Sequence, residues 1–247
     1  MKIQQLFDEL EKTTKNKEFI FESTGIVNRF NEMQYGFFPL GLGILTENNK
    51  NEEAHPDNEI EEGGIMVLGN DFGTVSYVDG YVKNEAKKIG ETDSTTIKNL
   101  LNKSVHLNLN KTFFTNFYLG IRLVDGDYDG TTMTKRMFKG KEIKLEDVYK
   151  KLCFDFFVKQ LELLNPKVVI CLGHDVKNAL IDSIASDDFA NWNPKSKSIN
   201  KLHEEDNHII SNTILGDRTF IIISHPCDLR NFTKEQKGKL NEILDNC

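Results

Sequence analysis

Short apolar segments alternate with helix-period segments along most of the chain, and this alternation constrains the fold more than any other feature. Four apolar segments predict strands: GIMVLG (64–69), TFFTNFY (112–118), PKVVICLG (166–173) and TFIIIS (219–224). They are rich in β-branched or aromatic residues and hardly alternate with polar ones, which is typical of strands buried on both faces. We therefore predict an α/β fold, a three-layer αβα sandwich with a central, mostly parallel four-stranded sheet.

The segments between and beyond these strands predict helices, because their apolar residues recur at helical spacing. Helices are expected within residues 4–12, 95–103, 144–164, 175–185 and 232–244. The apolar stripe of the longest comprises Leu145, Val148, Leu152, Phe156 and Leu161, and that of residues 175–185 comprises Val176, Ala179, Leu180 and Ile184. Thr233 and Gln236 have the spacing of a capping box, which indicates that the last helix begins there.

The length of 247 residues suits one domain over residues 1–247, with surface insertions expected near 46–62 and 190–218. The longest apolar runs are far shorter than the roughly 20 residues of a membrane span, and the first residues are too acidic for a signal peptide. We expect a cytoplasmic monomer that does not enter membranes. The formal charge of −7 argues against a broad basic surface that coats nucleic acid, although it leaves room for a local basic groove.

The four cysteines lie far apart in the sequence and lack a close C-x-x-C pair. This spacing does not suit a zinc ribbon, an iron–sulfur cluster or a redox motif. We therefore expect no metal and no cofactor. Cys171, inside a predicted strand, is interpreted as a small buried hydrophobic residue.

Polar residues follow each predicted strand, at the edge where open parallel sheets bind their ligands. The segments concerned are NDFG (70–73), NFYLGIR (116–122), GHD (173–175) and HPCDLRN (225–231). A carboxylate such as Asp71 can hold and polarise a water, and a histidine such as His225 can stabilise an oxyanion. The carboxamide of Asn116 can both donate and accept, which suits the edge of a nucleobase. These three residues are the first candidates for a site.

Four motifs in this order resemble the uracil-DNA glycosylase superfamily: GNDFG (69–73), FFTNFYLGIR (113–122), NPKVVICLG (165–173) and SHPCDLRN (224–231). The resemblance implies that Asn70 and Asp71 belong to the water-activating motif, with Asp71 positioning the attacking water. It also implies that Asn116 hydrogen-bonds the uracil edge and that His225 stabilises negative charge on the leaving pyrimidine.

The same resemblance suggests how the site contacts DNA and which bases it accepts. Leu229 falls where several members place a wedge that fills the gap left by the flipped base, and Arg230 lies beside it. Phe72 replaces the usual proline, and Gly73 stands where one branch has a tyrosine that excludes thymine. Gly73 agrees with branches of broader or different base preference. The cluster-bearing branches use four ligating cysteines whose spacing is not found in this sequence.

The chemistry of base excision fits these residue types. Breaking an N-glycosidic bond develops positive charge on the sugar and negative charge on the base, so a carboxylate and a hydrogen-bond donor both lower the barrier. A flipped base also needs an aromatic surface on which to stack, for which Phe72, Tyr77 and Tyr81 are candidates, although each could equally belong to the core.

The predicted function is that of a monofunctional DNA glycosylase, a hydrolase of base excision repair whose partner is DNA containing uracil or a damaged base. One alternative is a glycosylase-like module that binds a base or nucleotide without cleaving it. Another is a hydrolase or transferase acting on a free nucleoside or other small metabolite, and a third is an αβα domain whose polar residues only complete the strand ends. A basic surface around Arg122, Lys135, Arg136 and Arg230 would favour DNA, because a small-molecule enzyme does not need one.

Overall fold

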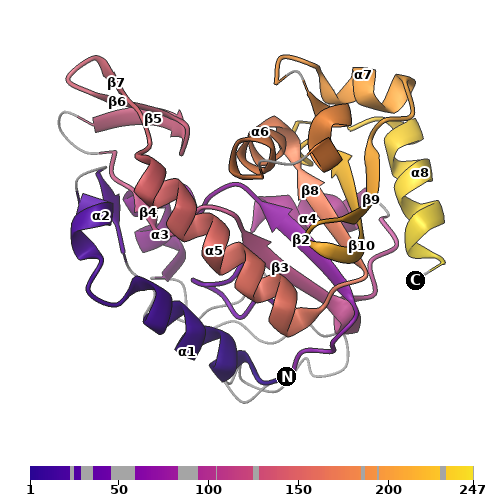
Figure 1. Cartoon of the computed structure of the whole chain (residues 1–247), viewed down its shortest axis with the longest axis horizontal. Coiled ribbons are helices and arrows are strands. Elements are labelled where there is room, and N and C mark those ends of the chain that lie inside the picture. The colour runs from indigo at the N-terminus through magenta and orange to yellow at the C-terminus, as the bar shows by residue number, and fades with distance from the viewer. Residues whose placement is uncertain are drawn as a thin grey trace.

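A five-stranded sheet forms the centre of the protein in the computed structural model (Figure 1). The structure describes residues 1–22, 25–28, 36–45, 59–82, 94–103, 105–124, 128–184, 187–193, 195–228 and 232–246. The strands, in their order across the sheet, are β3 (Thr112–Asn116), β2 (Ile65–Gly69), β8 (Val168–Leu172), β10 (Gly216–Ile223) and β9 (Ile209–Thr213).

The strands β3, β2, β8 and β10 correspond to the four predicted strands and run parallel to one another. The fifth strand, β9, pairs antiparallel with β10, so the sheet is mixed and the prediction of four strands is wrong in number. β9 lies at the edge of the sheet, where a strand has one neighbour instead of two and needs fewer apolar residues. Only the first two residues of its sequence, IISNT, are aliphatic, so the sequence resembles a loop. Part of the expected insertion at 190–218 therefore builds the sheet.

Helices lie in front of the sheet and behind it in Figure 1, which is compatible with an αβα layout. The α-helices are α1 (Ile3–Thr14), α2 (Glu18–Glu22), α3 (Val75–Val82), α4 (Thr95–Asn102), α5 (Asp147–Leu164), α6 (Gly173–Ser183), α7 (Ile199–Glu204) and α8 (Lys234–Leu244). Two 3-10 helices, η1 (Leu109–Lys111) and η2 (Asp187–Trp192), complete the set of helices in the described part of the chain. In that part, no helix is long and apolar enough to cross a membrane.

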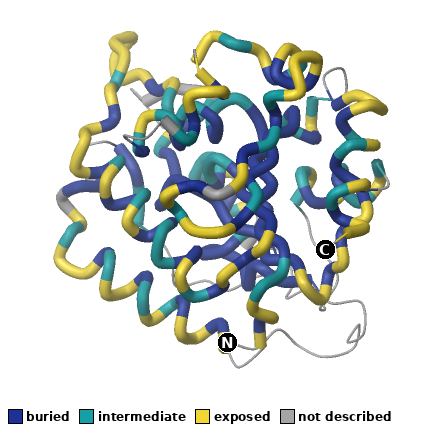
Figure 2. The backbone as a smooth tube through the Cα atoms, turned by 45° about the vertical axis from the view of Figure 1, so that its right-hand side comes forward, coloured by how far each residue is buried: buried dark blue, intermediate teal, exposed yellow. Residues whose placement is uncertain are grey.

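The hydrophobic core is continuous from α1 to α8, and Figure 2 shows the buried segments in the interior with exposed segments around them. Every residue of β2, β3 and β8 is buried, as the unalternated sequences predicted. The predicted stripe of α6 is buried throughout. In the stripe predicted for α5, however, Val148 is exposed, because the helix instead turns Tyr149, Cys153 and Phe157 toward the core.

Two small sheets flank the carboxyl edge of the central sheet, and neither was predicted. β1 (Ile26–Val27) pairs with β4 (Ile121–Arg122), whereas β5 (Tyr128–Thr132), β6 (Lys135–Phe138) and β7 (Lys141–Ile143) form an antiparallel three-stranded sheet. β6 and β7 are largely exposed, so their sequence carries no hydrophobic run by which to recognise strands. Met133, in the turn between β5 and β6, is nevertheless fully buried.

Candidate active site

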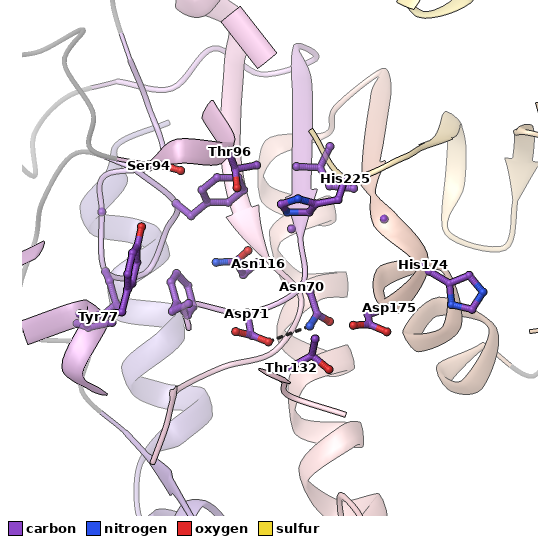
Figure 3. Close-up of a pocket in the computed structure, with 18 of the residues that line it drawn as sticks. Asn70, Asp71, Tyr77, Ser94, Thr96, Asn116, Thr132, His174, Asp175 and His225 are labelled. Atoms are coloured by element: carbon purple, nitrogen blue, oxygen red, sulfur yellow. Dashed lines mark hydrogen bonds between the residues drawn. The ribbon is translucent and has the colours of Figure 1, made fainter. Parts of the chain in front are cut away.

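A cavity of about 570 Å³ opens at the carboxyl edge of the parallel strands. Its walls come from the ends of β2, β3 and β8, the residues that follow β2 and β10, and the segment around Phe37. Helix α3, the starts of α4 and α6, and the facing ends of β5 and β6 complete them. Six of the predicted site residues line it: Asn70, Asp71, Phe72, Tyr77, Asn116 and His225. Figure 3 shows Asn70, Asp71, Asn116 and His225 around the same space. The volume lies within the range of small-molecule sites.

Asn116 is the last residue of β3, where it pairs in register with Gly69 at the end of β2. A Cβ atom at Gly69 would collide with Asn116 Oδ1, so only glycine lets the carboxamide lie across the end of β2. Asn116 is 5 % exposed, and within the described residues its carboxamide has no hydrogen-bond partner. A buried amide normally has a partner. Because this one lines the cavity, it is available to a ligand.

His225 follows β10, and its position is set by helix α8. Gln236 is buried and accepts a hydrogen bond from the backbone N–H of Ser224 at 3.1 Å, while its amide donates to Asn200 Oδ1 at 2.7 Å. Thr233 caps α8 as predicted, but the glutamine of the expected capping box thus holds the end of β10 instead.

The imidazole of His225 has a defined protonation state. Its Nδ1 accepts the backbone N–H of Cys227 at 3.3 Å, so the neutral ring carries its proton on Nε2. Burial lowers the pKa of His225, and the nearby carboxylates of Asp71 and Asp175 counteract that effect only in part. The ring is therefore a neutral hydrogen-bond donor at neutral pH, suited to an oxygen that gains negative charge.

The carboxylate of Asp71 is fully engaged by protein donors. Oδ1 accepts the backbone N–H of Gly73 at 2.7 Å and Nε of Arg122 at 3.2 Å. Oδ2 accepts Nδ2 of Asn70 at 2.9 Å and the backbone N–H of Met133 at 2.8 Å. The side chains of Asp71 and Arg122 are only 7 % and 8 % exposed. Asp71 thus ties β2 to β4 and to the β5–β6 turn.

A second carboxylate, Asp175, also lines the cavity. It lies in the first turn of α6, three residues after the end of β8, and it is half-buried. In the described part of the chain, neither a hydrogen-bond donor nor an ion-pair partner contacts it. Figure 3 shows Asp175 near Asn70, with the Asn70 carboxamide between the two carboxylates in that view.

The aromatic candidates differ in their positions. Phe72 is 9 % exposed and packs against Leu40 and Val78, so it is both core and cavity wall. Tyr77 is 53 % exposed at the cavity. Gly73 does not line the cavity. Its φ of +87° favours glycine, since residues with a side chain rarely adopt this conformation. In addition, a Cβ atom at this position would lie 3.3 Å from the Tyr77 ring.

Some of the predicted contacts with DNA fall outside the described residues. These are Leu229 and Arg230, together with the side chain of Tyr81. Of the basic residues proposed to discriminate DNA from small molecules, Arg122 and Arg136 are buried and face the protein interior. Lys135 is exposed and lines the cavity.

Several cavity residues were not assigned from the sequence. Asp175 and His174 belong to the segment GHD, which follows a predicted strand and was therefore expected near the ligand. The sequence did not assign a role to either side chain. His174 Nδ1 lies 3.1 Å from Nδ2 of Asn178, and Figure 3 shows its ring turned away from the other site residues. Thr132 comes from the unpredicted small sheet, so no sequence signal pointed to it.

No family model matches this chain, and no curated protein matches it. The resemblance to uracil-DNA glycosylases therefore depends on the four sequence motifs alone.

Proposed function

We propose that the protein is a glycosylase-type hydrolase that cleaves the N-glycosidic bond of uracil or a related damaged base in DNA. The observation that carries the proposal is the unpartnered, buried Asn116 carboxamide in a cavity that also contains a neutral imidazole and carboxylates. The three kinds of group come from separate strand ends. Together they supply what excision of a base requires: recognition of the base, stabilisation of its charge and activation of water.

The base would be recognised at the β3 end of the cavity. A carboxamide offers a donor and an acceptor side by side, which complements the N3–H and O4 edge of uracil. Phe72 adds an apolar wall to the same cavity. Burial of Asn116 strengthens this recognition, since a base that could not pair with the amide would leave it unsatisfied.

Departure of the base would be assisted from the β10 end. As the C1′–N bond breaks, its electron pair moves to the base, where a pyrimidine spreads the charge to its oxygens. The Nε2–H of His225 can then donate to such an oxygen without first losing or gaining a proton. A water attacks C1′, and its proton passes to a carboxylate of the cavity. The products are the free base and an abasic sugar.

The first test is incubation of the purified protein with single- and double-stranded oligonucleotides that contain one uracil, followed by alkaline cleavage of abasic sites. We expect strand cleavage by the wild type and its loss in Asn116→Asp, which removes the amide donor. Asn110→Asp, at an exposed position on η1, is the matched control and should cleave normally. Absence of cleavage with uracil and with a panel of damaged bases would contradict the proposal; tight binding without cleavage would instead favour the binding-module alternative.

A second candidate is hydrolysis of a free nucleoside, and the burial of Arg122 and Arg136 favours it, since neither can contact a phosphate backbone from its position. Release of free base from deoxyuridine, measured by chromatography beside the oligonucleotide assay, separates the two. Faster release of the base from the nucleoside than from the oligonucleotide would show that the substrate is a free nucleoside and not DNA.

A further inference from the structure

The cavity contains two carboxylates in opposite electrostatic situations, and this contrast points to a catalytic residue that the motif comparison does not identify. Both Asp71 and Asp175 line the cavity, and both act to raise the pKa of His225, so both are close to the reacting region. The inference that follows depends on the proposed glycosidic hydrolysis.

Asp71 is poorly suited to take a proton from water. A carboxylate has about four acceptor positions, and the side chain of Asp71 already receives four donors, from Asn70, Gly73, Arg122 and Met133. Any water would have to displace one of these donors. In that event the Asn70 amide, a backbone N–H or the Arg122 guanidinium would lose a hydrogen bond to Asp71.

Asp175 has the reverse properties. Its carboxylate lines the cavity, and the described residues provide no hydrogen-bond or ion-pair partner for it. A partly exposed carboxylate with free lone pairs can accept a hydrogen bond from a water and then its proton.

Asn70 lies between the two carboxylates in Figure 3. Because Nδ2 of Asn70 donates to Asp71, the amide orientation is set and Oδ1 points elsewhere. Oδ1 is buried and has no hydrogen-bond partner, although Asn70 lines the cavity. Asp71 therefore orients Asn70, whose Oδ1 is closed to water, and Asp175 is the carboxylate of the two whose acceptor positions a water in the cavity can use.

We propose that Asp175 is the catalytic base of this site and that Asp71 is a positioning residue, which orients Asn70. The oxygen of the attacking water bonds to C1′ while the C1′–N bond breaks and its electron pair leaves with the base. One water proton passes to the Asp175 carboxylate and then to solvent. The departing base anion, stabilised by the Nε2–H of His225, takes up a proton from solvent.

The competing interpretation is that Asp175 only stabilises the start of α6. Asp147 provides a matched control, because it is an exposed carboxylate in the first turn of α5, remote from the cavity residues in sequence and not among them. If the helix dipole were the whole role of Asp175, Asp175→Asn and Asp147→Asn would change the unfolding free energy by similar amounts and would leave excision unchanged.

The test compares single-turnover excision from uracil-containing oligonucleotides by wild type, Asp175→Asn, Asp175→Ser and Asp147→Asn, with binding of the same oligonucleotides measured by fluorescence anisotropy. We expect both Asp175 variants to fold, to bind the oligonucleotide within about threefold of wild type, and to lose about 10²–10⁴-fold in excision rate. Asp147→Asn should retain the wild-type rate.

The outcomes separate the two proposals. An active wild type with Asp175 variants that are folded and equally active would overturn the assignment of Asp175 and leave the proposed function intact. If the rate falls only as much as binding does, Asp175 is a binding residue and the catalytic assignment is again wrong. A wild type that excises no base from any oligonucleotide or nucleoside overturns the proposed function, and the role of Asp175 falls with it.

Discussion

The two halves of the cavity are held in place by different means. At the β2–β3 half, the buried ion pair between Asp71 and Arg122 and the surrounding backbone donors form a closed network around the carboxylate, while the Asn116 carboxamide stays open to a ligand. At the β8–β10 half, the polar groups that face the cavity, Asp175 and His225, keep hydrogen-bonding capacity for a ligand. The comparison teaches that a carboxylate in a cavity is not by itself a catalytic one, because a carboxylate whose acceptor positions are filled serves the fold.

The largest expected effect is on stability and belongs to the β2–β3 half. Asp71→Asn removes the buried charge that pairs with the Arg122 guanidinium and places an N–H₂ group against donors, so we expect a loss of about 3–5 kcal/mol in unfolding free energy. Asp175→Asn should change it by less than about 0.5 kcal/mol. Urea unfolding followed by the fluorescence of the single, buried Trp192 measures both. Equal stabilities of the two variants would remove the contrast between the halves.

The next effect is on the chemistry of the β8–β10 half. His225→Leu removes the Nε2–H donor and keeps an apolar side chain, so the single-turnover excision rate should fall about 10²–10³-fold. His174→Leu is the control, because its ring also reaches the cavity but turns away from the other site residues (Figure 3). A larger fall in rate in the His174 variant than in the His225 variant would show that His225 is not the donor.

A smaller effect tests how the β10 end is held. Gln236→Leu leaves the buried N–H of Ser224 without an acceptor, at a cost of about 1–3 kcal/mol in unfolding free energy. The excision rate should also fall, because the next residue is His225. Gln4→Leu, on the exposed surface of α1, is the control and should be neutral. A Gln236 variant with lower stability but an unchanged rate would show that β10 holds His225 without α8.

The smallest effect is a dependence of stability on pH that also belongs to the β10 side. His203 and His208 are buried and stack with their ring centroids 4.0 Å apart, and Nε2 of His203 contacts the backbone oxygen of Ile222 in β10 at 2.8 Å. Burial, the neighbouring His208 and Lys239 lower the pKa of His203 from 6.5 to about 4, against the opposing effects of the Ile222 carbonyl and Glu235. Burial and Lys239 likewise lower the pKa of His208, against Asp206 and Glu235.

The sign of that dependence follows from the lowered pKa values. In the unfolded chain His203 binds a proton near pH 6.5, whereas in the folded protein it does so only near pH 4, so stability is full above pH 6.5 and is lost as the pH falls toward 4. The uptake of one proton on unfolding lowers the free energy of unfolding by at most about 1.4 kcal/mol for each pH unit below pH 6.5. Urea unfolding at pH 7.5, 6.5 and 5.5 measures it. His203→Gln should flatten the dependence and His106→Gln, at an exposed position, should not; equal slopes in wild type and His203→Gln would contradict the assignment.

The sequence predicted the four parallel strands and the helices α1, α4, α5, α6 and α8 with small errors at their ends, but it did not predict α2, α3 or α7. Strands such as VVICL and FIII are apolar along their whole length, so their burial on both faces is encoded locally. The strand β9 and the sheet β5–β6–β7 were not predicted from the sequence, because edge and surface strands depend on pairing partners that a local pattern does not reveal. Because the apolar runs mark where each strand ends, they also indicated which polar residues follow the strands.

For the site, the sequence alone determined which residue types follow each strand, and hence that Asp71, Asn116 and His225 come to one edge of the sheet. Only the tertiary structure decided what each can do. The backbone N–H of Met133 and the guanidinium of Arg122 reach Asp71 from 62 and 51 residues away, and no donor from the described residues reaches Asp175. The number of hydrogen bonds that a carboxylate receives depends on segments distant in sequence, so its chemical role is a property of the folded chain.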